Sequence, residues 1–251
     1  MTEPGPLRPH RDLDSYYDGG EPGRREFVRE IFDRSAGDYD RVERMMALGT
    51  GSWYRRRALA RSGLVAGARV LDVAIGTGLV AREAIALVGS RGLVVGLDPS
   101  AGMLLHARQA LAAPVVLGTG ERLPFADALF DFLSLGYALR HLADLRAAFG
   151  EFLRVLRPGG TVCLLEITPP RSGPQRALLR AYVRGVIPLL TRLTTRHRET
   201  ARLWQYFWDT MEGCVPPREV LAALAAAGFA GADRFVELGM FSEYTGRRPT
   251  A

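Results

Sequence analysis

The sequence predicts an α/β fold: a Rossmann-like, mostly parallel sheet of seven strands with helices on both faces, plus an N-terminal helical cap. Three observations lead to this prediction. An apolar stretch at 70–74 breaks into the turn Gly76-Thr77-Gly78, and a helical pattern follows at 79–88. A second apolar stretch, 93–97, ends on Asp98. Further apolar stretches then alternate with helical ones, which is the pattern of a parallel sheet.

The elements can be assigned in order along the chain. We expect strands at 70–74, 93–97, 115–117, 132–136, 161–167, 230–238 and 240–246. We expect helices at 24–34, roughly 41–61, 79–88, 100–112, 143–156, about 174–187, 198–212 and 217–227. Arg157-Pro158-Gly159-Gly160 is expected to stop a helix and form a tight turn.

These elements suggest three regions. Residues 1–22, which are rich in Pro and Gly, are expected to be a mobile segment. Residues 23–62 are expected to form the helical cap, either as packing helices or as a lid that touches substrate. Residues 63–251 are expected to form the core, with a helical insertion at about 174–212.

Composition excludes several classes of chemistry. All 33 basic residues are Arg, so a lysine base or a lysine Schiff base is excluded. The net charge of +6 raises the question of a nucleic-acid partner, but the Arg residues are spread along the chain and no basic arm is present. Two Cys and four His without ligand spacing predict no metal site. Without a signal-peptide pattern or a membrane-spanning apolar stretch, we expect a cytoplasmic protein.

The glycine turn predicts a nucleotide-like cofactor beyond the carboxyl ends of the strands. Gly76-x-Gly78-x-x-Ala81 also fits the dinucleotide fingerprint. Asp72 favours S-adenosylmethionine, because a carboxylate in the first strand attracts the ammonium of a methionine moiety and repels a pyrophosphate. Asp98 suits the ribose hydroxyls of either cofactor, or caps the next helix in competition with Ser100.

Polar residues also follow the later strands of the predicted sheet. A polar residue of the segment 119–125 is expected to meet an adenine edge, with Leu123 and Phe125 flanking the ring, and an ordinary polar loop with a hydrophobic plug is the alternative. The complete set predicted to bind the cofactor is Asp72, Ala74, Gly76, Thr77, Gly78, Asp98, Pro99, Met103, Thr119, Gly120, Glu121 and Gly136.

Candidates for catalysis follow the fourth strand. His141 suits acid–base chemistry near neutral pH, with a helix cap as the alternative. Arg140 can hold an anionic oxygen, and Tyr137 and Tyr39 are candidates for orienting a substrate. Glu166 ends the fifth strand, where it either faces the cavity or caps a surface helix. Aromatic residues at 204–208 are core residues or line a pocket for a flat substrate.

At this point the chain resembles the class I S-adenosylmethionine-dependent methyltransferases, and most closely the ubiquinone/menaquinone biosynthesis C-methyltransferase family. The segments that carry this resemblance are Phe32-Asp33-x-x-Ala36-x-x-Tyr39-Asp40, 70–78, 121–125, Phe130-Asp131, Leu139-Arg140, 154–160, Leu165-Glu166 with Pro169, and 227–229. The resemblance implies a last strand antiparallel to the others, Thr77 and Asp98 at the cofactor, Thr119 and Gly120 at the adenine, and Tyr39 and Arg140 near the substrate.

The chain departs from that family in the substrate half. Val42 and Glu43 stand where the family has Met and Asn, and His141 stands where it has Asn after Leu-Arg. Ala47 and about Gly51 stand where the family has Ser and His. The C-terminal segment 239–244 also differs. The cofactor half is kept, which suggests a relative that acts on another aromatic or polyketide-like acceptor.

The sequence therefore predicts a methyltransferase that uses S-adenosylmethionine and acts on a small aromatic, quinol or enol-type acceptor, by C-methylation in quinone or secondary-metabolite biosynthesis. O- or N-methylation of a natural product is the alternative, and a non-catalytic cofactor-binding subunit of a biosynthetic complex is a rival from another class. We expect a small-molecule partner and no nucleic acid. The sequence does not decide whether the protein forms a homodimer. It also does not decide whether residues 174–198 contact a membrane surface, which would be expected if the acceptor is a lipid quinone.

Overall fold

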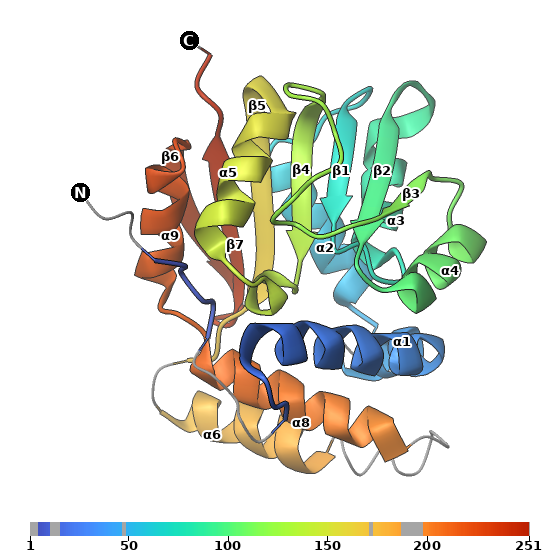
Figure 1. The fold of residues 1–251 in the computed structure, drawn as a ribbon, viewed down its shortest axis with the longest axis vertical. Coiled ribbons are helices and arrows are strands. Elements are labelled where there is room, and N and C mark those ends of the chain that lie inside the picture. Colours follow the sequence, from blue (N-terminus) through green and yellow to red (C-terminus); the bar gives the residue numbers. More distant parts are fainter. Residues whose placement is uncertain (1–4, 11–15, 47–48, 171–172, 187–197, 251) are drawn as a thin grey trace.

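The structure is a computed structural model that describes residues 5–10, 16–46, 49–170, 173–186 and 198–250. Its described residues form one sheet in the order β3-β2-β1-β4-β5-β7-β6 (Figure 1). The strands are β1 (Arg69–Val73), β2 (Leu93–Asp98), β3 (Val115–Leu117), β4 (Phe130–Gly136), β5 (Leu156–Ile167), β6 (Ala230–Glu237) and β7 (Phe241–Arg247). The first five run parallel, and β7 is antiparallel to both β5 and β6. This confirms the predicted seven-stranded, mostly parallel sheet.

Helices cover both faces of the sheet, as the alternating pattern predicted. Successive residues of β1 point to opposite faces, so Leu71 and Val73 belong to one buried cluster and Val70 to the other. The first cluster is closed by α5 (Leu145–Val155) and α9 (Pro217–Ala226). The second is closed by α2 (Gly51–Arg61), α3 (Leu79–Val88) and α4 (Ala101–Ala110).

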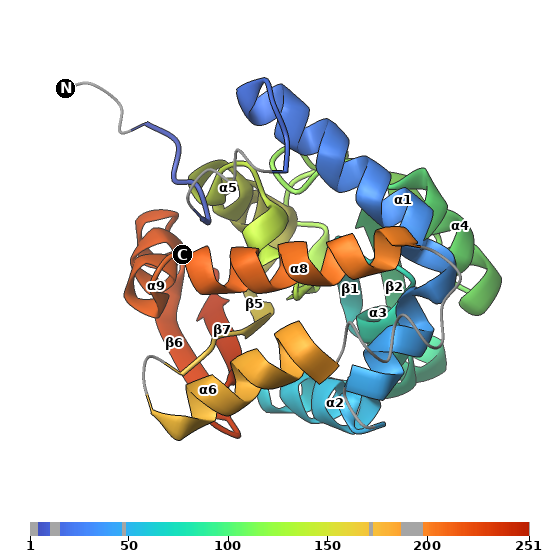
Figure 2. The same ribbon diagram turned by 90° about the horizontal axis from the view of Figure 1, so that it is seen from below.

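A third layer of helices lies beyond the carboxyl ends of the parallel strands (Figures 1 and 2). It consists of α1 (Gly20–Met46), α6 (Pro174–Ala181), the π-helical turn η3 (Tyr182–Val186) and α8 (Arg198–Gly213). Its own apolar cluster includes Val28 and Ile31 from α1, Val183 from η3, and Leu203 and Trp208 from α8. The helices α6 and α8 and the turn η3 thus join α1 in covering the edge of the sheet where ligands bind in this class of fold.

The predicted break inside the N-terminal cap is wrong. A helix at 24–34 and another at 41–61 were expected, whereas α1 is continuous from Gly20 to Met46 and α2 begins at Gly51. Gly37 lies within α1, where glycine costs about 1 kcal/mol relative to alanine. Burial of Val28, Ile31 and Ala36 outweighs that cost, since these side chains are no more than 8% exposed.

The tight turn predicted at 157–160 is also wrong, because β5 begins at Leu156 and continues through this segment. Leu156 pairs with Phe130, and a register shift before Phe132 accommodates the extra residues as a bulge. Backbone bonds to Arg248 fix the segment: Gly159 N donates to Arg248 O, and Arg248 N donates to Gly160 O, both at 2.9 Å.

The N-terminal segment that was expected to be mobile follows a defined path at residues 5–10 and enters α1 at residue 20. Leu7 accepts a hydrogen bond from Leu145 N and donates one to the Asp144 carboxylate, both at 3.0 Å. Pro9 O accepts from Val215 N at 2.7 Å. These bonds connect residues 5–10 to the start of α5 and to the chain between α8 and α9.

None of the helices among the described residues has the length and apolar character needed to span a membrane.

Candidate active site

A cavity of about 520 Å³ lies between the carboxyl edge of the sheet and α1. This volume falls in the range of small-molecule sites. Its lining includes most of the residues predicted from the strand ends. From the predicted cofactor set it contains Ala74, Gly76, Asp98, Pro99, Met103, Thr119, Gly120, Glu121 and Gly136. From the predicted catalytic set it contains Tyr39, Tyr137 and His141.

The glycine turn leaves room for a ligand at one position and packs tightly at another. Gly76 has a φ of +57°, and a Cβ added there would meet nothing within 4 Å, so this backbone opens onto the cavity. Gly78 has a φ of +94° and precedes the first turn of α3. A Cβ at Gly78 would lie 2.4 Å from Leu111 Cδ1, so Gly78 serves packing and does not line the cavity.

Asp98 lies at the end of β2 with its carboxylate held by two backbone amides. Oδ2 accepts from Gly76 N and Oδ1 accepts from Ser100 N, both at 2.8 Å. Ser100 caps α4 by accepting from Met103 N at 3.0 Å, which leaves Asp98 free of the capping role. Burial raises the pKa of Asp98 to about 6, so its carboxylate is ionised at neutral pH.

Asp72 lies behind the glycine turn and is not part of the cavity lining. Its Oδ1 accepts from Ser134 Oγ at 2.6 Å, and its Oδ2 has no hydrogen-bond partner among the described residues. Burial raises the pKa of Asp72 to about 7. Asp72 therefore joins β1 to β4 behind the glycine turn, and its contact with a methionine ammonium, directly or through water, stays a prediction.

Two carboxylates of α1 hold that helix over the glycine turn and the start of α4. The hydroxyl of Thr77, which does not line the cavity, donates to Asp40. Asp33 accepts from Ser100 Oγ and, at 2.9 Å, from Gly102 N. Residue-by-residue reasoning did not single out Asp33 or Asp40, although both belong to the motif at 32–40 that carried the family resemblance.

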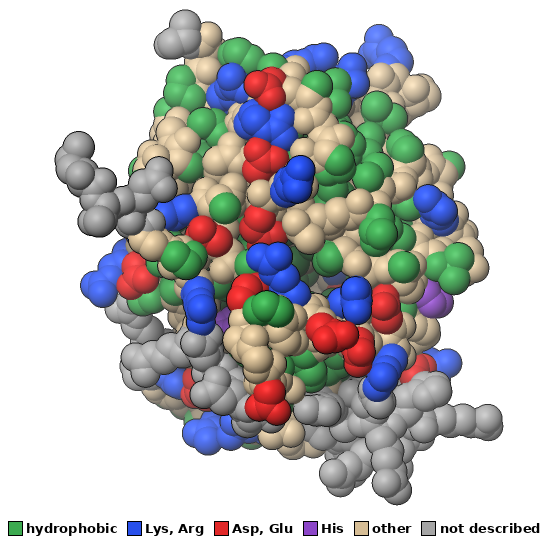
Figure 3. Space-filling model, viewed as in Figure 1, with side chains coloured by type: hydrophobic (Ala, Val, Ile, Leu, Met, Phe, Trp, Pro, Cys, Tyr) green, Lys and Arg blue, Asp and Glu red, His purple; other side chains and the backbone are tan. Residues whose placement is uncertain are grey.

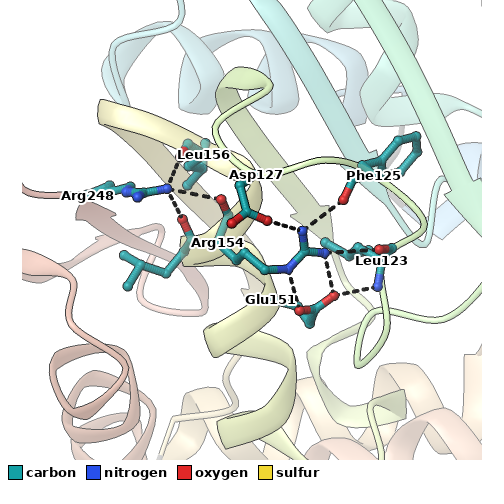
Figure 4. A network of polar contacts seen from close by, with 8 residues as sticks. Leu123, Phe125, Asp127, Glu151, Arg154, Leu156 and Arg248 are labelled. Carbon is teal, nitrogen blue, oxygen red and sulfur yellow. Dashed lines mark hydrogen bonds and ion pairs between the residues drawn. The ribbon is translucent and has the colours of Figure 1, made fainter.

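The loop that carries Thr119, Gly120 and Glu121 is fixed from outside the cavity by Arg154 on α5 (Figure 4). Arg154 donates to the carbonyls of Leu123 (3.0 Å) and Phe125 (2.8 Å). It also pairs with Glu151, which accepts from Leu123 N at 2.8 Å. The Arg154 guanidinium lowers the pKa of Glu151. Figure 4 shows these groups converging on the loop, which explains why residues 121–125 and 154–160 occur together in the family pattern.

His141 lines the cavity in an aromatic environment. Its ring centroid is 5.2 Å from that of Phe32 and 5.6 Å from that of Tyr206, and its Nδ1 is 3.5 Å from the Tyr206 hydroxyl. Its Nε2 is buried and has no hydrogen-bond partner among the described residues. Asp144 caps α5, so the capping alternative for His141 does not hold. Burial, followed by nearby positive charge, lowers the pKa of His141 well below 6.5.

Tyr39 and Tyr137 also line the cavity. Burial raises the pKa of Tyr39 to about 12 and also raises that of Tyr137, so both phenols stay protonated and can donate hydrogen bonds. Tyr137 has a φ of +59°, a strained backbone for a bulky residue at the end of a strand.

Arg140 does not line the cavity, contrary to its predicted contact with the substrate. Its side chain is 3% exposed and pairs with Glu166, and its guanidinium lies over the Phe207 ring at 4.9 Å. Glu166 also accepts from Ile167 N at 2.8 Å, so it is a buried partner of Arg140 and neither a cavity group nor a surface cap.

The aromatic cluster on α8 is mainly core, with one side next to His141. Tyr206, Phe207 and Trp208 are at most 5% exposed and pack against α1. Tyr206 and Phe207 also contact the His141 ring. The side chain of Trp204, and residue Ala47 among the family departures, lie outside the described residues.

Comparison with known proteins identifies the family. The model of the ubiE/COQ5 methyltransferase family matches residues 21–240. The chain belongs to this family. Like other ubiE/COQ5 enzymes, it is an S-adenosylmethionine-dependent methyltransferase. The residues fit that cofactor, because Gly76 opens onto the cavity and the Asp98 carboxylate is held at its edge.

The relatives of this ubiE/COQ5 chain are named for quinone biosynthesis. It is 32% identical over 213 residues to a ubiquinone/menaquinone biosynthesis C-methyltransferase from Coxiella burnetii, covering 82% of this chain and 84% of that protein. It is 30% identical over 235 residues to a demethylmenaquinone methyltransferase from Symbiobacterium thermophilum, covering 90% and 94%. A methyltransferase structure from Thermotoga maritima, described as a possible histamine N-methyltransferase, aligns with a TM-score of 0.62 at 18% identity, covering 88% and 99%. The likeness to that structure shows the fold alone.

Proposed function

We propose that this ubiE/COQ5 enzyme transfers a methyl group to carbon of a small oxygenated aromatic, quinol or enol-type acceptor, in quinone or secondary-metabolite biosynthesis. The observation that carries the proposal is the buried Nε2 of His141. His141 lines the cavity, this nitrogen has no hydrogen-bond partner among the described residues, and the ring contacts those of Phe32, Tyr206 and Phe207. Aromatic rings suit a flat ligand, and the unpartnered nitrogen of His141 suits a ligand oxygen that forms a hydrogen bond with it.

The cavity divides into a cofactor side and an acceptor side. Asp98, Gly76 and the loop at 119–121 would hold S-adenosylmethionine. When bound, this cofactor supplies a methyl group activated by a positively charged sulfur. The protein's task is then to align a nucleophilic atom and to stabilise charge on its oxygen, because the methyl group itself needs no further activation.

The chain's own residues can perform that task. His141 meets the acceptor oxygen through Nε2, either by taking its proton or by donating a hydrogen bond to it. Tyr39 and Tyr137 donate hydrogen bonds as neutral phenols and orient the acceptor. Arg140 acts as a positioning residue, since its buried ion pair with Glu166 fixes the turn that carries His141.

The replacement His141→Leu tests the proposal. With saturating S-adenosylmethionine we expect kcat to fall by about 100-fold, the size of a lost acid–base or oxyanion contact. Affinity for S-adenosylhomocysteine should be unchanged. The measurement is release of S-adenosylhomocysteine with three acceptors: a short-chain naphthoquinol, a phenol and a cyclic 1,3-diketone.

His106→Gln is the matched control, because His106 lies on α4 outside the cavity lining and should keep full activity. Full activity in His141→Leu would remove His141 from the reaction. Cofactor binding by the native protein without turnover of any of these acceptors would refute the acceptor class and favour the non-catalytic subunit.

Methylation of nucleic acid is less well supported. On the face of the molecule seen in Figure 3, acidic and basic side chains are interspersed and no single-sign surface is present. A protein that binds nucleic acid through its backbone charge needs a continuous basic surface.

A further inference from the structure

Three aromatic rings that line the cavity share one contact on α8. Phe32 and Tyr39 come from α1, His141 comes from the turn after β4, and all three line the cavity. The ring centroid of Phe207, on α8, lies 5.8 Å from that of Phe32 and 5.8 Å from that of His141. It lies 6.5 Å from that of Tyr39, edge to face. One residue of α8 thus contacts cavity-lining rings from two other elements.

Phe207 itself belongs to the layer behind these rings. It is 5% exposed, and no described residue of α8 lines the cavity. This helix lies alongside α1 beyond the strand ends (Figures 1 and 2). Because protein interiors are close-packed, a buried ring that contacts three others limits how far they can move. The position of this part of the cavity wall therefore depends on a residue that does not line the cavity.

Arg140 holds the Phe207 ring from the turn after β4. Its guanidinium carbon lies over that ring at 4.9 Å, within the range of a cation–π contact. The guanidinium is anchored in turn by its ion pair with Glu166, and both side chains are 3% exposed. Arg140 and His141 are neighbours in the chain, so the same turn meets Phe207 with both side chains. Phe207 therefore couples this turn to α1.

We propose that Phe207 is a positioning residue that sets the width of the acceptor side of the cavity and so selects flat acceptors. This inference rests on the proposed function and adds to it the residue that determines the acceptor's shape. A planar acceptor can lie against the rings of Phe32, Tyr39 and His141. An acceptor with bulky groups outside its ring plane must push one of these rings towards Phe207. Displacing close-packed rings costs free energy, so the bulky acceptor binds less tightly.

Two phenols with the same number of carbon atoms and different shapes test the proposal. The probe 2-naphthol is flat, whereas the butyl group of 4-tert-butylphenol projects out of the ring plane. Calorimetry measures the Kd of each phenol for the protein loaded with S-adenosylhomocysteine. For the native protein we expect the flat phenol to bind at least about tenfold more tightly. Equal affinities, or binding of neither phenol, overturn the proposal.

The variants Phe207→Ala and Phe207→Leu remove support from behind the aromatic wall. Truncating a buried aromatic side chain leaves space that neighbouring side chains or apolar ligands can fill. We expect the preference for 2-naphthol to fall by about tenfold in Phe207→Ala. It should fall by a smaller factor in Phe207→Leu, which removes fewer atoms and disturbs the fold less. Affinity for S-adenosylhomocysteine should stay within about twofold of the native value, because Asp98 and Gly76 are unchanged. A native preference in both variants overturns the role of Phe207.

The matched control is Phe130→Leu. Phe130 is 1% exposed and begins β4, whereas the cavity lies at the other end of that strand, where Gly136 lines it. The same change of side chain there should also lower stability, but it should leave the preference between the two phenols unchanged. An equal loss of preference in Phe130→Leu would be a general effect of core damage and would contradict the assignment to Phe207.

Turnover separates the proposed function from this inference, because binding of the phenols does not require methyl transfer. Binding with the expected shape preference, but without turnover of any of the three acceptors, refutes the proposed function and leaves the role of Phe207 standing. Turnover by the native protein, with an unchanged shape preference in the Phe207 variants, refutes the role of Phe207 and leaves the proposed function standing.

Discussion

At the scale of single residues, the most informative group is a carboxylate that does not touch the cavity. Asp72 is 1% exposed, and one of its oxygens has no hydrogen-bond partner among the described residues. Burial raises its pKa from 3.8 to about 7. Because the folded-state pKa is the higher one, the stability that Asp72 contributes is complete below about pH 4. It is lost as pH rises through about 7.

We therefore expect Asp72→Asn to be more stable than the native protein at pH 8. The gain should be about 2–4 kcal/mol in the free energy of unfolding, the upper value being the full shift of about three pKa units. The gain should shrink towards pH 4, where the native carboxyl is already neutral. Urea unfolding at pH 5 and pH 8 measures both values, and a pH-independent difference would contradict this account. Ser134→Ala is the control for loss of the hydrogen bond to Asp72.

The backbone at Ala74 provides a second residue-scale prediction. Ala74 has a φ of +53°, a left-handed conformation that costs a side-chain-bearing residue about 1–2 kcal/mol. Glycine adopts it freely but loses more chain entropy on folding. We expect Ala74→Gly to raise stability by about 0.5–1 kcal/mol, and Ala74→Val to lower it. Thermal unfolding of the two variants tests the signs, and destabilisation by glycine would show that the strain is relieved elsewhere.

At the scale of elements, the sequence predicted the strands and glycine turn well, because alternating burial and apolar stretches are local signals. The helical cap was less predictable. Two helices, at 24–34 and roughly 41–61, were predicted there, yet α1 continues through Gly37 because its buried face contacts α8, which is far away in the sequence. Arg140 was predicted to contact the substrate because its partner in the structure could not be seen in the sequence. That partner, Glu166 on β5, comes next to Arg140 only through the order of the strands in the sheet. Such tertiary contacts leave no periodic signal in a single sequence.

The two carboxylates of α1 explain why this helix lies over the cavity. Asp33 accepts hydrogen bonds from Ser100 Oγ and Gly102 N, which joins α1 to the N-terminal end of α4. We expect Asp33→Ala to destabilise the protein by about 1 kcal/mol, as for loss of a helix cap. It should also weaken S-adenosylhomocysteine binding several-fold. Calorimetry measures the affinity, and Glu30→Ala, which alters an exposed pair on the same helix, is the control. Equal effects of the two variants would contradict the role of Asp33.

At the scale of the whole molecule, the cavity lies between two separately packed parts. The sheet with its flanking helices forms two apolar clusters, and α1, η3 and α8 form a third beyond the strand ends. Both parts contribute to the cavity lining. Glu43, at a position where the sequence departs from the family pattern, pairs with the buried Arg55 at 2.6 Å and joins α1 to α2.

A ligand that bridges these two parts should stabilise the whole fold. At a concentration 100 times its Kd, S-adenosylhomocysteine should add about 2.7 kcal/mol to the free energy of unfolding. For a chain of this length that corresponds to a rise in Tm of about 5–10 °C. NAD should produce no rise, because the chain belongs to a family of S-adenosylmethionine-dependent methyltransferases. Scanning calorimetry with both ligands tests this. A rise with NAD alone would contradict the cofactor assignment, whereas a biphasic transition with S-adenosylhomocysteine would show that the cap unfolds independently of the sheet.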